Sequence, residues 1–308
     1  MEVRVATTDW NRIFEGWAGP PGDDERERID RAVKAVRDAL DADDGLRSVT
    51  RVFVHGSYRN SVNVRADTDV DLGVLYTGHA FFAEYPPGTT RADFGNVEGD
   101  KNYSEFKDAL GGALERHLGS AVLRGSKAFD IKENCYRVDA DVAPFFVHRR
   151  YSSYRSFICG VEMWSDGQDR IVNWPERLFD EPHWPDQHYE NGVAKNTETH
   201  HRYKSVVRII KSLRNHLEET GSAEAKQISG FFVECLVFNV PSHLFGGNEW
   251  ESTVQNALSW LWEATASDDA CMGWREVSKW KYLFKGLSGK RQQAHAFLEM
   301  ARAYVGSR

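Results

Sequence analysis

Two apolar segments constrain this sequence more than any other feature, because one ends in a Gly-Ser pair and the other begins with an Asp-x-Asp pair. Residues 52–54 lead into Gly56-Ser57, and Asp69-Val70-Asp71 leads into the apolar run 72–75. Side chains on a strand alternate between its two faces, so both aspartates are expected on one face and Val70 on the other, in a core. The pattern predicts an α+β fold in which a β-sheet presents two carboxylates close to a glycine turn.

The two pairs have complementary chemistry. Gly56 lets the backbone approach a phosphate without a Cβ, and Ser57 offers a hydroxyl and an N–H. Asp69 and Asp71 repel each other unless a cation lies between them, and Mg²⁺ is bound by a few carboxylates together with water and phosphate oxygens. Two such ions about 4 Å apart stabilise the attacking and leaving oxygens of an in-line displacement at phosphorus. The pattern therefore predicts Mg²⁺-dependent nucleotidyl transfer, and the alternative is a surface turn followed by an acidic loop.

A third carboxylate is expected from a strand over residues 136–147. Asp139 and Asp141 are two positions apart there, so they share one face of the strand. Periodicity alone does not separate them, and both stay candidates at this point.

The complete series, Gly-Ser, Asp-x-Asp and then Asp141-Val142-Ala143-Pro144-Phe145, resembles the polymerase-β-type nucleotidyltransferases. More narrowly, it is similar to the oligoadenylate synthases and the cGAS/DncV-like group, known in bacteria as CD-NTases. In that pattern the third metal ligand is the acid before Val-x-Pro, so the resemblance implies Asp141 as this ligand, with Asp139 outside the coordination shell or simply solvated. It also implies a bilobal fold. A catalytic core with a mixed sheet is expected at residues 1–165, a crossover loop and α-helical lobe at 166–308, and the active site in the cleft between them.

A helix with one buried stripe is predicted from Tyr203 to Leu217, because apolar residues recur there at helical intervals. Lys204, Arg208 and Lys211 form an adjoining basic stripe. The resemblance implies that Lys211 contacts the triphosphate and that Ser229, at the start of the next helix, touches the γ-phosphate. A solvated basic face remains the alternative for the stripe. An N-cap remains the alternative for Ser229.

Periodicity also predicts helices over residues 23–40 and 102–118, and strands over 121–123, 128–131, 136–147 and 156–163. Residues 166–196 are expected to form a long loop, and residues 78–96 an insertion loop.

Composition excludes several classes of protein. No apolar run approaches the about 20 residues that cross a bilayer, and no signal-peptide pattern begins the chain, so a cytoplasmic protein without a membrane partner is expected. The net charge of −7 argues against a nucleic-acid activator. Four scattered cysteines predict neither a zinc site nor a disulfide framework. The histidines at 183, 188, 200 and 201 are interpreted as ordinary loop residues rather than metal ligands.

The resemblance implies an enzyme that condenses ATP and other nucleoside triphosphates, with release of pyrophosphate, into a cyclic di- or trinucleotide second messenger. Mg²⁺ is the expected cofactor, and Mn²⁺ can substitute for it. The resemblance also implies a place in bacterial antiphage (CBASS) signalling, in which the cyclic oligonucleotide acts on a separate effector. Three alternatives remain: a template-independent terminal RNA nucleotidyltransferase, an AMP transferase acting on a protein, and a catalytically silent nucleotide-binding module. Three intact acids argue against the last.

Overall fold

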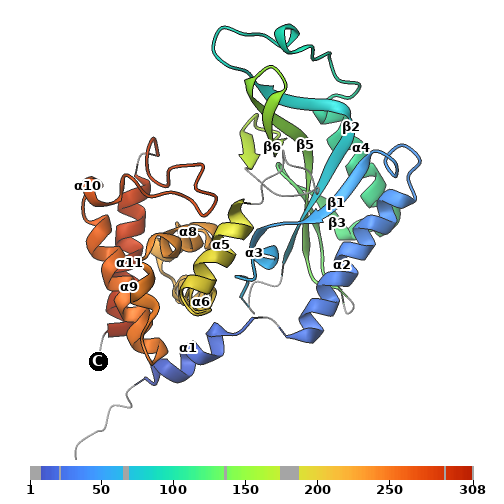
Figure 1. The fold of residues 1–308 in the computed structure, drawn as a ribbon. Coiled ribbons are helices and arrows are strands. Elements are labelled where there is room, and N and C mark those ends of the chain that lie inside the picture. The colour runs from blue at the N-terminus through green and yellow to red at the C-terminus, as the bar shows by residue number, and fades with distance from the viewer. Residues whose placement is uncertain are drawn as a thin grey trace, which may run out of the picture. The chain divides into compact units, whose positions relative to one another are not determined.

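The computed structural model describes residues 8–20, 22–64, 69–134, 137–173, 187–287 and 289–306, which form two compact units (Figure 1). The sheet unit comprises the described parts of Gly22–Asn60 and Thr68–Tyr189. The helical unit comprises the described parts of Met1–Pro21, Ser61–Asp67 and Glu190–Arg308. The predicted α+β architecture, a mixed sheet with flanking helices and a C-terminal helical lobe, is confirmed.

The sheet unit is built on a mixed sheet with the strand order β1-β2-β5-β4-β3. β2 and β5 run parallel, whereas β1 is antiparallel to β2 and β4 is antiparallel to β5. β6 continues the sheet from the distal half of β5, and β7 pairs with β6. The strands are β1 (Thr50–Val54), β2 (Val70–Glu84), β3 (Val122–Arg124), β4 (Phe129–Ile131), β5 (Ala140–Ser153), β6 (Ser156–Trp164) and β7 (Arg170–Asn173).

Two amphipathic helices, α2 (Asp23–Asp41) and α4 (Tyr103–Leu118), cover one face of this sheet (Figure 1). Both were predicted, and α4 begins with a capping box between Asn102 and Glu105. Their apolar side chains form one core with Val70 and the other residues of β2 that share its face. Val70 is fully buried, as predicted, and so are Leu72 and Val74. The alternate residues of β2, beginning with Asp71, are therefore on the opposite face.

Gly73 of β2 leaves room for an aromatic ring on that opposite face. A Cβ at this position would overlap the ring of Phe53, which comes from the neighbouring strand β1. Phe53 also contacts Phe145 of β5, with ring centroids 5.7 Å apart. Because Gly73 has no side chain, the ring of Phe53 lies over β2 and reaches Phe145 of β5.

We expect Gly73→Ala to lower the free energy of unfolding by about 1–3 kcal/mol, because the added methyl group overpacks the site beneath Phe53. Urea unfolding followed by circular dichroism would measure the change. Gly16→Ala is the matched control, since a Cβ there meets nothing within 4 Å in the middle of a helix. Its stability should be unchanged or raised by up to about 1 kcal/mol. Equal effects of the two substitutions would contradict the packing account.

The helical unit is organised around α6 (Tyr203–Glu219), whose predicted apolar stripe from Tyr203 to Leu217 is buried in one core. α1 (Trp10–Ala18) contributes Trp10 and Phe14 to the same core. Its other helices are α7 (Ala223–Lys226), α8 (Gly230–Asn239), α9 (Trp250–Thr265), α10 (Asp268–Cys271) and α11 (Lys290–Gly306), and α5 (Gln187–Glu198) begins in the sheet unit. The short elements are α3 (Gly56–Arg59), η1 (Ala92–Phe94), η2 (Gly119–Ala121) and η3 (Ser242–Phe245).

Two expected loops are partly regular structure. The predicted loop over residues 166–196 contains β7 and most of α5, and the predicted insertion over 78–96 begins inside β2, which continues to Glu84. β2 continues because its distal half pairs with β5 beyond a register shift between Tyr76 and Phe81. Residues 174–186, which include His183, and Tyr136 lie outside the described residues.

The two units also divide the chain differently from the expected boundary between residues 165 and 166. β7 extends the sheet through its pairing with β6, and α1 packs in the core of the helical unit although it precedes the sheet in the sequence. No described helix is both long and apolar enough to cross a bilayer. Among the described cysteines, Cys159, Cys235 and Cys271 are buried and not joined in disulfides.

Candidate active site

Two of the predicted acids lie side by side at the start of the central parallel strand pair. Asp71 of β2 and Asp141 of β5 are direct register partners, so their side chains project from the same face of the sheet. That face is opposite to α2 and α4. Asp69, which precedes β2, is exposed and two positions from Asp71.

The Gly-Ser turn lies directly against this acidic pair. Gly56 begins the short helix α3 with a φ of 67°, a conformation that glycine adopts without steric cost. A Cβ at Gly56 would overlap the carboxylate of Asp71, and the backbone N–H of His55 donates to the Asp71 carbonyl at 3.0 Å. Asn60 then closes the turn, since its side chain donates to the Gly56 carbonyl at 3.0 Å. Ser57 therefore directly follows Gly56, whose backbone lies against the Asp71 carboxylate.

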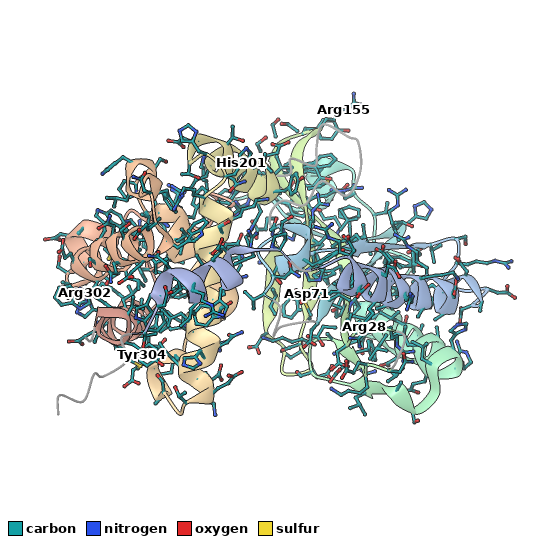
Figure 2. All side chains as sticks on the ribbon, turned by 90° about the horizontal axis from the view of Figure 1, so that it is seen from below. Arg28, Asp71, Arg155, His201, Arg302 and Tyr304 are labelled. Carbon is teal, nitrogen blue, oxygen red and sulfur yellow. The ribbon has the colours of Figure 1, made fainter. Side chains whose placement is uncertain are left out.

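Asp139 has a different environment from Asp141. Its carboxylate accepts a hydrogen bond from the backbone N–H of Glu133, in the connection between β4 and β5. Arg28 of α2 binds this connection through the Glu133 carboxylate at 3.0 Å and the Arg137 carbonyl at 3.2 Å (Arg28 and Asp71 are labelled in Figure 2). The Asp139 carboxylate is thus bound to the backbone at Glu133, which supports Asp141 as the third acid.

The sequence analysis did not predict a fourth acid, Asp130, and a cation, Lys132, beside Asp71 and Asp141. These four residues are called the acidic row below. Asp130 of β4 is the register partner of Asp141 on the side away from Asp71. Its carboxylate accepts from Lys132 at 2.6 Å, and the Lys132 ammonium is 3.9 Å from Asp139. The alternation Phe129-Asp130-Ile131, with both apolar neighbours buried, was the available signal.

The charges of the acidic row affect one another. Burial, followed by the negative charges of Asp71 and Asp130, raises the pKa of Asp141. The hydrogen bond from Lys132 to Asp130 is the main reason why the pKa of Lys132 is raised. Within the described residues, no group of three or more His, Cys, Asp or Glu side chains has the arrangement of a formed metal site. The acidic row thus offers carboxylate oxygens, which are hard ligands, and it has more negative than positive charge.

The helical unit holds the other two predicted site residues close together. Lys211 of α6 is only 4% exposed, and its Cε is 3.5 Å from the position of a Cβ at Gly230, the first residue of α8. Ser229 caps this helix, since its hydroxyl accepts from the Phe232 N–H at 3.2 Å. The structure thus supports the N-cap alternative for Ser229, and it places Lys211 beside the same helix start.

The basic stripe of α6 does not act as one surface. Lys204 is half-buried, and desolvation lowers its pKa, whereas the charge of Glu234 opposes the shift. Arg208 is only 6% exposed and binds backbone carbonyls of the helical unit. The Arg208 guanidinium is bound to backbone carbonyls of the protein. It is therefore neither a solvated surface charge nor a group that contacts phosphate.

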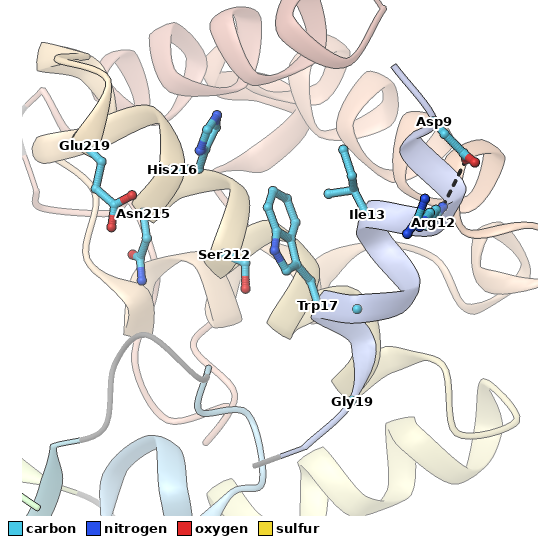
Figure 3. Close-up of a pocket in the computed structure, with 10 residues that line it drawn as sticks. Asp9, Arg12, Ile13, Trp17, Gly19, Ser212, Asn215, His216 and Glu219 are labelled. Carbon is cyan, nitrogen blue, oxygen red and sulfur yellow. Dashed lines mark hydrogen bonds between the residues drawn. The ribbon is translucent and has the colours of Figure 1, made fainter. Parts of the chain in front are cut away.

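A separate cavity of about 820 Å³ lies between α1 and α6 in the helical unit (Figure 3). Ile13 and Trp17 of α1 line one side, and Ser212 and His216 of α6 line the other. None of the predicted site residues lines it.

Comparisons with known proteins identify the family of the chain. The profile of the cGAS/DncV-like nucleotidyltransferase C-terminal helical domain matches residues 190–306. A cyclic dipyrimidine nucleotide synthase CdnE from Legionella pneumophila is 36% identical over 304 residues, which cover 96% of this chain and 98% of that protein. The chain belongs to the cGAS/DncV-like nucleotidyltransferases.

Two further relatives of this cGAS/DncV-like nucleotidyltransferase match over most of their length. A cyclic dipyrimidine nucleotide synthase CdnE from Cecembia lonarensis is 34% identical over 273 residues, which cover 88% of this chain and 89% of the relative. The solved structure of the CdnE cyclic dinucleotide synthase from Elizabethkingia meningoseptica with GTP and Apcpp gives a TM-score of 0.77 at 29% identity. It covers 96% of this chain and 98% of that one, so the resemblance noted in the sequence is confirmed over both units.

Proposed function

We propose that this cGAS/DncV-like nucleotidyltransferase is a Mg²⁺-dependent synthase of a cyclic dinucleotide. The observation that carries the proposal is the register pairing of Asp71 with Asp141, with the Gly56 turn packed against the Asp71 carboxylate. This arrangement brings together groups that would bind metal and phosphate. The chain also shares 36% identity with a cyclic dipyrimidine nucleotide synthase over nearly its whole length.

The acids suit the metal that the family implies. Asp69, Asp71 and Asp141 offer carboxylate oxygens, which Mg²⁺ prefers. Burial, followed by the negative charges of Asp71 and Asp130, raises the pKa of Asp141, and a bound cation would offset this charge. These three aspartates would hold Mg²⁺, and Mn²⁺ can take its place because it accepts the same ligands. When bound, the metal supplies charge stabilisation to the oxygens of the displacement at phosphorus.

The reaction joins two nucleoside triphosphates in two displacements. In the first, a ribose hydroxyl of one nucleotide forms a bond to the α-phosphorus of the other, and pyrophosphate leaves with the broken P–O bond. The linear product repeats the step within itself, so two nucleoside triphosphates give one cyclic dinucleotide and two pyrophosphates. Gly56 and Ser57 would bind the donor triphosphate through backbone N–H and hydroxyl groups. Lys211 would contact the same triphosphate from the helical unit. The Ser229 hydroxyl would do so as well, because it can donate to an anion while it accepts from the Phe232 N–H as an N-cap.

We expect Lys211→Met to raise the Kd for a nucleoside triphosphate by about 10-fold to 100-fold, because a charge-assisted hydrogen bond is worth about 1.5–3 kcal/mol. Methionine has a similar length and suits a side chain that is 4% exposed. Calorimetric titration with non-hydrolysable UTP and ATP analogues would measure the change. Lys226→Met is the control, since Lys226 is an exposed residue of α7. An unchanged Kd for Lys211→Met would remove Lys211 from the binding site.

We propose that at least one base of the product is a pyrimidine. The relatives from Legionella pneumophila and Cecembia lonarensis, at 36% and 34% identity, both carry the name cyclic dipyrimidine nucleotide synthase. Reactions from which UTP and CTP are omitted should therefore give no cyclic product.

The test of the function is incubation of the purified protein with Mg²⁺ and each pair of labelled nucleoside triphosphates, followed by phosphatase digestion. A small phosphatase-resistant product that requires UTP or CTP is expected. A ladder on added RNA would instead identify a terminal transferase, label on protein would identify an AMP transferase, and the absence of turnover with every pair would identify a silent binding module.

In the cell, the cyclic product would act as a second messenger on a separate effector in bacterial antiphage (CBASS) signalling. This placement rests on the family resemblance, and a cytoplasmic enzyme would meet its nucleotide substrates there. Co-expression with a candidate effector in a bacterium, with and without an intact Asp71, would test the link through phage resistance.

A further inference from the structure

Arg208 is a buried cation whose four hydrogen bonds go to two backbone carbonyls and one hydroxyl. Its Nε donates to the Ala18 carbonyl at 2.7 Å, and one terminal nitrogen donates to the Ser61 carbonyl at 2.6 Å. The other terminal nitrogen donates to the Ala18 carbonyl and to the Ser205 hydroxyl, the latter at 3.0 Å. Within the described residues, Arg208 forms no ion pair.

Burial of this guanidinium is costly, since several kcal/mol of hydration must be replaced by protein dipoles. Desolvation alone lowers the pKa of Arg208 to about 10, so the group stays charged at neutral pH. Ala18 is the last residue of α1, where carbonyls lack partners within the helix and the helix dipole is negative. The last turn of α1 contains no basic residue of its own, and Arg208 of α6 supplies the missing positive charge.

The Ala18 and Ser61 carbonyls both lie near positions at which the chain passes from one unit to the other. Ala18 lies three residues before the passage at Pro21 and Gly22, and Ser61 is the first residue after the passage at Asn60. Figure 3 shows the end of α1 at Gly19, with α6 beside it at Ser212. One side chain thus binds both crossings to the same helix.

Ser61 directly follows the Gly-Ser turn. Asn60 closes that turn onto the Gly56 carbonyl, and Ser61 has a φ of 56°, which is unfavourable for a residue with a Cβ. Val62 is fully buried in the core of the helical unit, so the segment is held on both sides of the strained residue. The hydrogen bond from Arg208 to the Ser61 carbonyl holds this conformation immediately beside the turn that carries Ser57.

We propose that Arg208 is a positioning residue, which binds two chain crossings to α6 and thereby restrains the backbone that leads out of the Gly56-Ser57 turn. The inference rests on the proposed function, in which this turn binds the donor triphosphate. Arg208 acts through Ser61 and contacts neither substrate nor metal. Its role differs from that of Lys211, one turn further along the same helix, which would touch the triphosphate.

The test compares Arg208→Lys with a matched core variant. Lysine keeps the charge but does not reproduce the planar fork that binds two carbonyls. We expect kcat/KM of Arg208→Lys to fall by about 10-fold to 100-fold, since small misplacements of a positioning group cost that much. Leu258→Ala removes a buried side chain of α9 in the same core and should lower Tm at least as far, with kcat/KM unchanged.

A second measurement does not depend on activity. Hydrogen exchange of amides in residues 56–64 should become faster in Arg208→Lys and stay unchanged in Leu258→Ala. In Arg208→Ala, millimolar guanidinium should restore slow exchange and activity, whereas sodium chloride at equal ionic strength should not. If exchange over residues 56–64 were equal in the two variants, the proposal would be overturned. A wild-type protein that makes no cyclic product would refute the proposed function alone, because the exchange measurement would still decide the role of Arg208.

Discussion

Replacing Asp69 and Asp71 together by asparagine is expected to abolish synthesis of the cyclic product while the fold remains intact. The loss should be at least about 10³-fold, because several kcal/mol of charge stabilisation at the reacting phosphate would be removed. Asparagine has the shape of aspartate, and its neutral amide relieves the repulsion with Asp141, its partner across the strand pair. Product formation and thermal unfolding, each with and without Mg²⁺, would be measured. The rise of Tm on adding Mg²⁺ should disappear in the double variant.

Single substitutions of Asp139 and Asp141 provide the discriminating control. Asp139→Asn should retain activity, since the new amide oxygen can still accept the Glu133 N–H. Asp141→Asn should be as inactive as the double variant. The reverse result would make Asp139 the third ligand, and full activity in both would refute the proposed metal site.

Gly56→Ala is expected to lower kcat/KM by about 100-fold. The new methyl group would overlap the Asp71 carboxylate, so the carboxylate or the turn must move away from its place. The positive φ of 67° adds a backbone cost of about 1–2 kcal/mol to folding. The assay of cyclic product and urea unfolding would separate the loss of catalysis from the loss of stability.

Gly88→Ala is the matched control for this experiment. Gly88 has a φ of 80° and lies in the loop after β2, but a Cβ there meets nothing within 4 Å. Both variants should therefore pay a similar backbone cost, and only Gly56→Ala should lose activity. Equal activity in the two variants would show that the closeness of Gly56 and Asp71 is irrelevant to the reaction.

Local patterns predicted the elements whose periodicity is strong. The helix from Asp23 was apparent from its apolar stripe, and β2 from the alternation that begins at Val70. α5 was missed because its residues 187–198 are mostly polar and contain Gly192, so no apolar stripe is visible. β7 was missed because a four-residue strand is defined mainly by its pairing with β6.

Long-range contacts account for what local patterns did not predict about the site. The pairing of Asp71 with Asp141 follows from a parallel register, which joins residues far apart in the sequence. Asp130 enters the acidic row only through the pairing of β4 with β5. Arg208 shares helical spacing with Lys204 and Lys211, and nothing in that spacing shows that its partners are the carbonyls of Ala18 and Ser61.

Neither unit is a continuous stretch of the chain, and this limits how the enzyme can be dissected. The helical unit draws on three segments, so a fragment starting near residue 166 would lack Trp10, Phe14 and Val62 from its core. A fragment ending near residue 166 would expose the apolar side of α1, which packs in the core of the helical unit. It would also lack β7 and so leave the edge of β6 unpaired. We therefore expect both fragments to aggregate on expression. The roles of the two units have to be assigned with point variants of the intact chain.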